Sequence, residues 1–209
     1  MKLIVGLGNP GARYAGTRHN VGVDVLDVLG ERHGVARREK RFKSELGAGR
    51  IGMEPVVLVA PQTFMNLSGE AVGPMVGWYK LGLDEVIVLH DDLDLPFGDV
   101  RVKVGGGHGG HNGLRDLIAK LPGPGFVRIR IGVGRPPGTM DPASFVLARW
   151  SSEEGSSVAG VLAQAADAVE SVMDDGIAAA MNRINGEGNA RRKSKLGKSD
   201  GKAPASAET

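Results

Sequence analysis

The first 33 residues constrain the fold most, because they read as a strand, a glycine-containing loop and a helix in direct succession. Residues 3–7 form an apolar run that is typical of a buried strand. Gly6, Gly8 and Gly11 lie at and just after the end of this strand, and residues 21–33 then place Val and Leu side chains on one helical face. A strand that leads into a helix is the building unit of α/β proteins, so the N-terminus predicts an α/β fold.

The rest of the chain repeats this alternation. The pattern predicts strands over residues 42–51, 55–60, 86–89, 100–104 and 126–133. It predicts helices over residues 66–81, 114–121, 153–173 and 177–184. The wholly apolar run at 86–89 is typical of a central strand that is buried on both faces. We therefore expect a single three-layer domain over residues 1–185, with a twisted mixed β-sheet flanked by helices.

Residues 186–209 differ from this body in composition. They lack apolar periodicity, are rich in Gly, Ser, Ala and Lys, and carry a net charge of +3, which leaves −1 on the body. We expect a disordered Lys-rich C-terminal tail, which is either a solubilising appendage or an auxiliary RNA contact. A nucleic-acid site on the body would have to be a local basic patch.

Composition excludes several kinds of site. The chain has no cysteine, which rules out disulfides, thiolate zinc sites and cysteine nucleophiles. It also lacks a signal segment and any apolar run of about 18 residues, so we expect a cytoplasmic protein with no membrane contact.

The loop Gly6-Leu7-Gly8-Asn9-Pro10-Gly11 matches the G-x-G-x-x-G fingerprint of dinucleotide sites, with Glu31 downstream. Pro10 argues against that interpretation, because it removes a backbone donor and disfavours helical geometry at Asn9. The fingerprint needs helical N–H groups at this point to bind pyrophosphate. We interpret the loop as part of a catalytic floor. A dinucleotide-dependent oxidoreductase stays as an alternative, which absence of NAD or NADP binding would exclude.

Polar residues gather in five segments where folding alone does not require them. These segments are residues 9–11, 14–20, 63–69, 90–94 and 105–113. Four of the five follow a predicted strand, and α/β sheets bind ligands at the carboxyl ends of their strands. We expect the five segments to converge on one site.

His19 and Asp91 are the most useful pair within these segments. A neutral imidazole can take a proton from water, and a carboxylate on its other nitrogen fixes the tautomer and stabilises the imidazolium. No G-x-S-x-G nucleophile motif is present, so direct attack by water is favoured over covalent catalysis. Asn9, Asn66 and Asn112 could position substrate or stabilise an oxyanion.

Two other interpretations of these residues stay open. His19 could cap the start of the helix at residues 21–33, with Asn20 as the better N-cap. Alternatively, a metal could be held by His90, Asp91, Asp92, Asp94, His108 and His111. The chain has neither an H-E-x-x-H helix nor a two-metal carboxylate signature, and we expect no metal.

The glycine-rich loop at residues 105–113 could approach a phosphate or move as a lid. Six bases surround it in sequence: Arg101, Lys103, Arg115, Lys120, Arg128 and Arg130. Arg128 and Arg130 lie two apart on a predicted strand, so both should project from one face as part of a phosphate clamp, although a solvated charged face is the default alternative. Few aromatic residues accompany them, which favours recognition of a duplex backbone over base stacking.

Taken together, the segments resemble the bacterial peptidyl-tRNA hydrolase family. Four motifs carry the resemblance: GLGNPGARYAGTRHNVG (6–22), PQTFMNLSGEAV (61–72), VLHDDLDLPFGDVRVKVGGGHGGHNGLRDL (88–117) and FVRIRIGVGRP (126–136). The resemblance implies a monomeric enzyme without a cofactor. Its substrate would be peptidyl-tRNA, whose ester between the peptide and the 3′ end of tRNA it would hydrolyse to recycle tRNA released by ribosomes.

The resemblance also implies roles for individual residues. His19 would be the catalytic base and Asp91 would orient it. Substrate and the attacking water would contact Asn9, Tyr14, Met65, Asn66, His111 and Asn112. Lys103 and Arg130 would bind phosphates of the tRNA acceptor arm. A non-catalytic RNA-binding protein on the same scaffold is a second alternative, but binding alone would not need His19, Asp91 and the three asparagines together.

Overall fold

The structure is a computed structural model that describes residues 1–199. Seven strands form one sheet in the order β2-β3-β4-β1-β5-β7-β6. Their bounds are β1 Lys2–Gly6, β2 Glu39–Arg41, β3 Ser44–Ile51, β4 Glu54–Pro61, β5 Val86–Asp92, β6 Val100–Val104 and β7 Val127–Gly132. The pairs among β4, β1, β5 and β7 are parallel, whereas the β2–β3, β3–β4 and β6–β7 pairs are antiparallel. The predicted mixed sheet is confirmed.

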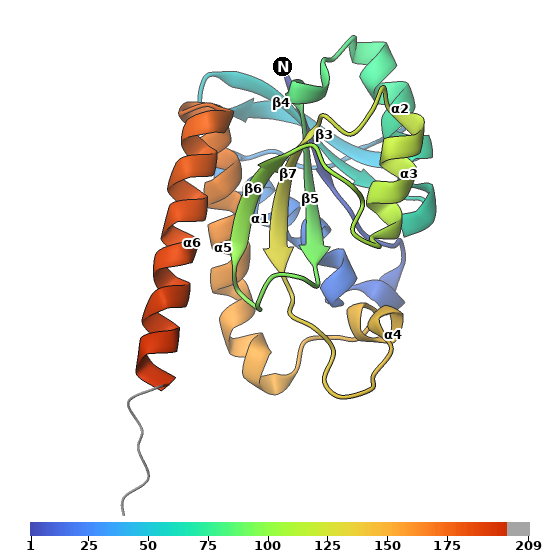
Figure 1. Cartoon of the computed structure of the whole chain (residues 1–209). Helices are drawn as coiled ribbons and strands as arrows, with labels where there is room; N and C mark the ends of the chain where they lie inside the picture. Colours follow the sequence, from blue (N-terminus) through green and yellow to red (C-terminus); the bar gives the residue numbers. More distant parts are fainter. Residues whose placement is uncertain (200–209) are drawn as a thin grey trace, which may run out of the picture.

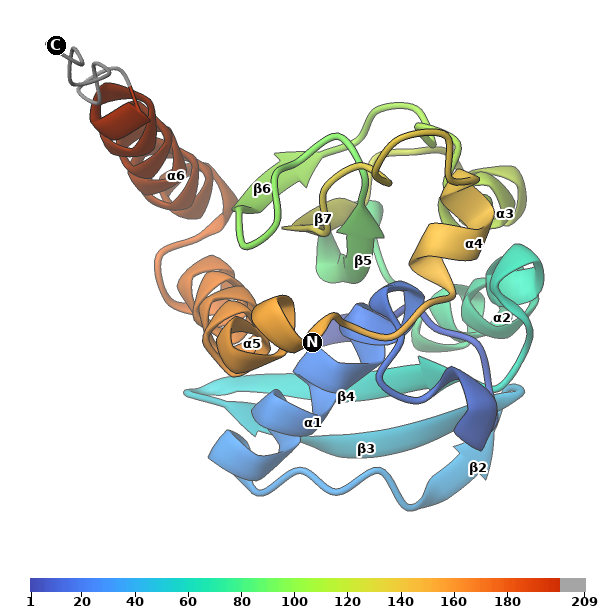
Figure 2. The same cartoon turned by 90° about the horizontal axis from the view of Figure 1, so that it is seen from below.

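Helices cover both faces of this sheet. Their bounds are α1 Val21–His33, α2 Ser68–Tyr79, α3 Asn112–Lys120, α4 Pro142–Val146, α5 Ser152–Asp174 and α6 Ile177–Ser199. Figure 1 and Figure 2 both place α5 and α6 on one side of the sheet and α2 and α3 on the other. Helix α1 packs on the same side as α5. The architecture is therefore the expected three-layer α/β domain.

Strand β1 lies between two hydrophobic cores and contributes to both, because successive side chains of a strand point to opposite faces of the sheet. Leu3 and Val5 pack in the core under α2 and α3, and Ile4 packs in the core under α1 and α5. All three side chains are completely buried, and each such burial stabilises the fold by about 1.5–3 kcal/mol. This apolar centre supports the loops that leave the carboxyl ends of β1 and β5.

Two glycines bring the start of α1 into direct contact with the sheet. A Cβ atom on Gly6 would lie 2.4 Å from the carbonyl oxygen of Gly22, and one on Gly22 would lie 2.3 Å from that of Leu89. No side chain fits at either position. The close approach sets the 3₁₀ turn η2, Arg18–Asn20, against the carboxyl end of β5.

Two short elements, β2 and α4, were not predicted. The three residues of β2 are all exposed, and the strand forms only through its pairing with β3. The turn between the two strands uses Phe42 and Lys43 at φ 51° and 52°, which no simple turn signal announces. Helix α4 has only five residues, too few for a helical period to be read.

Helix α6 is longer than predicted. We expected a helix near residues 177–184 followed by disorder from 186, but the helix continues to Ser199. Residues 186–199 of the predicted tail are therefore helical, and residues 200–209 lie outside the described part of the chain. Asn185 of this helix covers the edge of the sheet, because its side chain exchanges two hydrogen bonds of 3.0 Å with the backbone of Val102. Gly186 and Gly188 obscured the pattern, since glycine disfavours helix interiors.

None of the helices described in residues 1–199 is long and apolar enough to cross a membrane.

Candidate active site

A cleft of about 1120 Å³ opens where the carboxyl ends of β1, β4 and β5 meet. Each of the five polar segments contributes to its lining, represented by Asn9, His19, Met65, Asp91 and Asn112. The predicted convergence is confirmed. The parallel arrangement of β4, β1 and β5 places the ends of these strands at one edge of the sheet, which accounts for four of the segments. Residues 105–113 follow β6, which is antiparallel to its neighbour and ends at the other edge, so they reach the cleft through the loop that leads to α3.

His19 and Asp91 form a buried hydrogen-bonded pair in this cleft. Nδ1 of His19 lies 2.8 Å from Oδ1 of Asp91, and the residues are 9% and 3% exposed. Burial alone would raise the pKa of the Asp91 carboxyl, but His111 and His19 beside it hold the pKa well below its usual range. Ionised Asp91 can only accept, so Nδ1 of His19 carries the hydrogen and Nε2 is left as the basic nitrogen.

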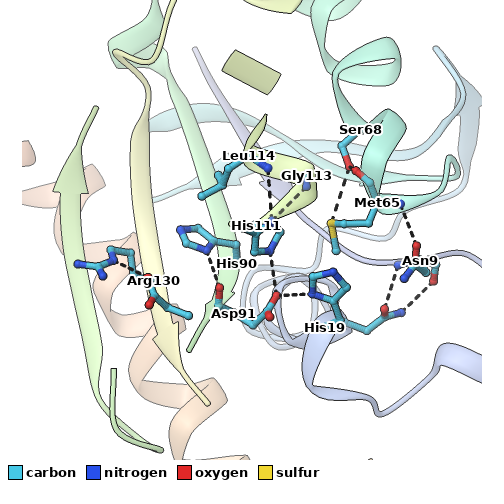
Figure 3. Close-up of polar contacts among 12 residues, drawn as sticks. Asn9, His19, Met65, Ser68, His90, Asp91, His111, Gly113, Leu114 and Arg130 are labelled. Atoms are coloured by element: carbon cyan, nitrogen blue, oxygen red, sulfur yellow. Dashed lines mark hydrogen bonds and ion pairs between the residues drawn. The ribbon is translucent and has the colours of Figure 1, made fainter. Parts of the chain in front are cut away.

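A second imidazole shares the same carboxylate oxygen. Nε2 of His111 lies 3.0 Å from Oδ1 of Asp91, and Figure 3 shows contacts from the His111 and His19 rings meeting at that oxygen. Nδ1 of His111 accepts hydrogen bonds from the backbone N–H groups of Gly113 and Leu114, which makes His111 the N-cap of α3. Sequence reasoning placed His111 at the cleft but missed both contacts.

His90 lies behind this pair at the end of β5. Its Nδ1 donates to the carbonyl oxygen of Asp91 at 2.7 Å. Complete burial, with His111 nearby, lowers the pKa of His90 to about 3, so the ring is neutral at physiological pH. His90 is therefore a buried neutral histidine at a strand end, as expected, but it is only half satisfied, because its Nε2 is buried without a hydrogen-bond partner.

The structure brings together a different set of possible metal ligands from the one that the sequence suggested. Ligand atoms of His19, Asp91 and His111 lie within 4.8 Å of one another. Hydrogen bonds account for this closeness. Because Nδ1 of His111 accepts from the backbone of α3, its Nε2 carries the proton and donates to Asp91 instead of offering a lone pair.

Hydrogen bonds hold both the side chain and the backbone of Asn9. Oδ1 of Asn9 accepts from the backbone N–H of Met65 at 2.8 Å, which fixes the orientation of the amide and leaves Nδ2 as its donor. The side chain of Asn20 bonds both the N–H and the carbonyl oxygen of Asn9, each at 2.9 Å. Asn20 stands at the N-cap position of α1, as considered, but its side chain makes no capping bond to the helix.

The remaining predicted substrate residues differ in position. Asn66 and Asn112 are exposed at the rim of the cleft, and Asn112 accepts a hydrogen bond of 2.8 Å from Arg115. Tyr14 does not line the cleft. Its ring packs edge-on against Phe64, with centroids 6.5 Å apart, and Phe64 does line the cleft.

Of the six bases predicted around the glycine loop, Lys103, Arg115, Arg128 and Arg130 line the cleft. Lys103 is exposed, and Arg130 is held by Asp92 through an Nε–Oδ2 contact of 2.7 Å. Arg128 does not form the predicted clamp with Arg130. It is 3% exposed and donates to the carbonyl oxygens of Gly106 and Gly107 at 2.6 Å each.

Arg128 is drawn away from the clamp because the backbone carbonyl groups of the glycine loop need hydrogen-bond donors. The guanidinium of Arg128 supplies donors to two of them. Arg101 is also buried, with its guanidinium bonded to the carbonyl oxygen of Asn185 in α6. Lys120 instead forms ion pairs with Glu70 and Asp116. The basic surface of the cleft is therefore smaller than the sequence suggested.

One wall of the cleft comes from α4 and was not foreseen. Its residues are Asp141, Pro142, Ala143, Val146 and Leu147. Arg18, next to His19, anchors this wall: it donates to the carbonyl oxygen of Arg149 at 2.8 Å and pairs with Glu154 at 2.5 Å. Its guanidinium also lies over the Phe145 ring, 4.2 Å from the centroid.

The fold and the cleft define an α/β protein with a histidine–carboxylate pair at the carboxyl edge of its sheet. The model of the family described as peptidyl-tRNA hydrolase matches residues 3–195. This chain therefore belongs to the peptidyl-tRNA hydrolase family, which confirms the resemblance seen in the sequence.

Individual relatives agree over most of the chain. A peptidyl-tRNA hydrolase of Chloroflexus aggregans is 52% identical over 186 residues, which are 88% of this chain and 99% of the relative. One from Mycobacterium bovis is 48% identical over 184 residues, which are 88% and 96% of the two chains. The crystal structure of peptidyl-tRNA hydrolase from Acinetobacter baumannii matches with a TM-score of 0.83 and 40% identity, covering 88% of this chain and 94% of that one.

Proposed function

We propose that this chain hydrolyses the ester bond between a peptide and the 3′ end of tRNA, and so recycles tRNA from peptidyl-tRNA released by ribosomes. Membership of the family supports the activity. The observation that carries the proposal is the buried His19–Asp91 pair, joined at 2.8 Å, on the floor of a cleft large enough for an acylated nucleotide.

The proposed reaction is direct attack by water. Nε2 of His19 takes a proton from the water as its oxygen bonds to the ester carbonyl carbon, and ionised Asp91 stabilises the imidazolium. The tetrahedral intermediate then expels the ribose oxygen, which receives the proton from His19. Acid–base help of this kind accelerates reactions by about 10²- to 10⁴-fold. No covalent intermediate with the protein forms.

Amide donors would stabilise the oxyanion that develops on the carbonyl. The Nδ2 group of Asn9 is oriented by the bond from Met65 N–H to its Oδ1, and Asn66 and Asn112 provide further amides at the rim. Donors that are already oriented lower the barrier most, because they need no reorganisation during the reaction. Met65 lines the cleft and is proposed to contact the peptide, and Tyr14 is proposed to act through its contact with Phe64.

Lys103 and Arg130 are proposed to bind phosphates of the acceptor arm. Both line the cleft, and Asp92 contacts Arg130 through Nε, so the terminal guanidinium nitrogens take no part in that bond. Phosphate contacts position an RNA without reading its bases, which suits an enzyme that must accept many tRNAs. The protein is proposed to act as a cytoplasmic monomer, and gel filtration checks the monomeric state.

The proposed substrate carries an acylated amine, and the cleft should reject a free one. A charged ammonium beside the amide groups would lose its water without a matching partner, at a cost of several kcal/mol, on the order seen for unpaired buried groups.

The test is to incubate the protein and EDTA with N-acetyl-aminoacyl-tRNA and with the same tRNA carrying an unblocked amino acid. The proposal predicts release of the blocked amino acid only. Tight binding of tRNA without release would favour the RNA-binding alternative, and equal release from both would contradict the proposed specificity.

A further inference from the structure

We propose that His111 is a positioning residue that shares the Asp91 carboxylate with His19 and thereby sets the pH range in which His19 is a base. The inference rests on the proposed function, because it takes His19 as the group that accepts the proton from water. It assigns His111 a task within the protein, distinct from the substrate contact that the family resemblance implied.

The hydrogen bonds of His111 determine its tautomer. Nδ1 accepts from the N–H groups of Gly113 at 3.1 Å and Leu114 at 3.3 Å, so this nitrogen holds its lone pair. In the neutral ring the proton is then on Nε2, which donates to Oδ1 of Asp91 at 3.0 Å. A ring held from both sides, with 8% of its side chain exposed, cannot turn toward a ligand without breaking the cap of α3.

Oδ1 of Asp91 consequently accepts two N–H bonds, one from each histidine, at 2.8 and 3.0 Å. A carboxylate whose charge is already partly satisfied by one donor stabilises a second, positively charged donor less. The bond from His111 therefore weakens the preference of Asp91 for protonated His19. Without it, the imidazolium form of His19 would persist to higher pH.

Three histidines lie around Asp91, and two of them bond its carboxylate. His19 bonds the carboxylate from η2 and His111 bonds it from the N-cap of α3, whereas His90 bonds the backbone carbonyl oxygen of Asp91. His90 is neutral, because burial lowers its pKa to about 3. The His19 and His111 rings are 4.9 Å apart, close enough that a proton on one disfavours a proton on the other.

Two substitutions separate the functions of the two ring nitrogens. In His111→Asn, the amide oxygen can replace Nδ1 as the cap of α3, but no donor reaches Asp91. In His111→Gln, the longer side chain places an N–H near the position of Nε2 and loses the cap. The measurement is the pH dependence of kcat/KM for N-acetyl-aminoacyl-tRNA, with His33→Asn, at the last residue of α1, as the control.

We expect the acidic limb of the profile to move up by about 0.5–1 pH unit in His111→Asn. In His111→Gln, the acidic limb of the kcat/KM profile should stay within about 0.2 pH units of its position in the unaltered protein. The Tm of this variant should fall, because capping bonds contribute about 1 kcal/mol. An unchanged limb in His111→Asn, or an equal shift in both variants, would overturn the inference. If His111→Asn does not fold, a shifted limb in His111→Gln still overturns it.

Direct titration of the His19 ring by NMR distinguishes this inference from the proposed function. An upward shift of the His19 titration in His111→Asn supports the shared carboxylate. If that shift is seen while His19→Ala remains active, the shared carboxylate stands and His19 is rejected as the base. If His19→Ala is inactive and the titration does not move, the role of His111 is rejected alone.

Discussion

Asn20 holds Asn9 by two hydrogen bonds, donating from Nδ2 to the carbonyl oxygen of Asn9 and accepting its N–H at Oδ1, each at 2.9 Å. Asn20 directly follows His19 in the chain, and the side chain of Asn9 in turn accepts from the N–H of Met65. One amide therefore links the proposed base to the proposed oxyanion donor and to the loop that enters α2.

Replacing Asn20 by Asp should reduce turnover while the protein stays folded. The carboxylate can still accept the N–H of Asn9, but it places negative charge against the carbonyl oxygen and displaces the loop. Misplacement by about 1 Å can lower rates roughly 100-fold, so we expect kcat/KM to fall by about 10- to 100-fold. Asn182→Asp, at an exposed position of α6, is the matched control. Equal rates in the two variants would show that this link is not needed.

Removing either proposed phosphate contact should weaken substrate binding more than chemistry. Lys103→Ala or Arg130→Ala should raise KM with a smaller change in kcat, and should reduce the slope of log KM against log salt by about 1. The control is Lys120→Ala, because Lys120 is paired with Glu70 and Asp116 and does not line the cleft. If the slope of log KM against log salt does not change in either variant, Lys103 and Arg130 do not bind phosphates of the tRNA.

Gly22→Ala should destabilise the protein, although alanine favours helices. The new Cβ would lie 2.3 Å from the carbonyl oxygen of Leu89, so α1 must move away from the sheet. Overpacking of this kind costs about 1–3 kcal/mol. Gly160→Ala in α5 meets no atom within 4 Å and should stabilise by up to about 1 kcal/mol. Urea unfolding measures both changes, and a stabilised Gly22→Ala would contradict the close contact.

Asp24→Asn should stabilise the protein near neutral pH and lose this effect in acid. Burial, with Asp27 nearby, raises the pKa of Asp24 to about 6. A group whose pKa is raised by folding stabilises below its unfolded pKa of about 3.9, and this contribution is lost as pH rises through about 6. The substitution should therefore add about 1–2 kcal/mol to the free energy of unfolding at pH 7.5 and almost nothing at pH 4. A gain of the same size at both pH values would be inconsistent with titration of Asp24.

The sequence predicted the longer elements well, because their periodicity is strong. Helix α1, Val21–His33, has the predicted bounds, and the apolar run at 86–89 lies in the central strand β5. Strand order could not be predicted in the same way, since the pairing of Leu3 with both Val57 and Val86 depends on the tertiary fold. The short elements β2 and α4 were missed because they form only against their neighbours.

The site, like the fold, could be predicted from the sequence only in part. The His19–Asp91 pair was found from residue types and motif order, and the structure brings the two side chains together. The second donor to Asp91 could not be found, because His111 reaches it only through a loop in which Gly109 and Gly110 take positive φ. Arg128 was misjudged for a similar reason: the carbonyl groups that bind it belong to Gly106 and Gly107, whose orientation no sequence pattern reports.

The most direct test of the account is the kcat/KM of His19→Ala for N-acetyl-aminoacyl-tRNA in EDTA, measured with the affinity for tRNA. His33→Ala is the control, since His33 is the last residue of α1, pairs with Glu170 of α5 and does not line the cleft. We expect kcat/KM to fall by about 10²- to 10⁴-fold in His19→Ala with tRNA affinity unchanged, and to stay the same in His33→Ala. Activity of His19→Ala close to that of His33→Ala would contradict the assignment of His19 as the base.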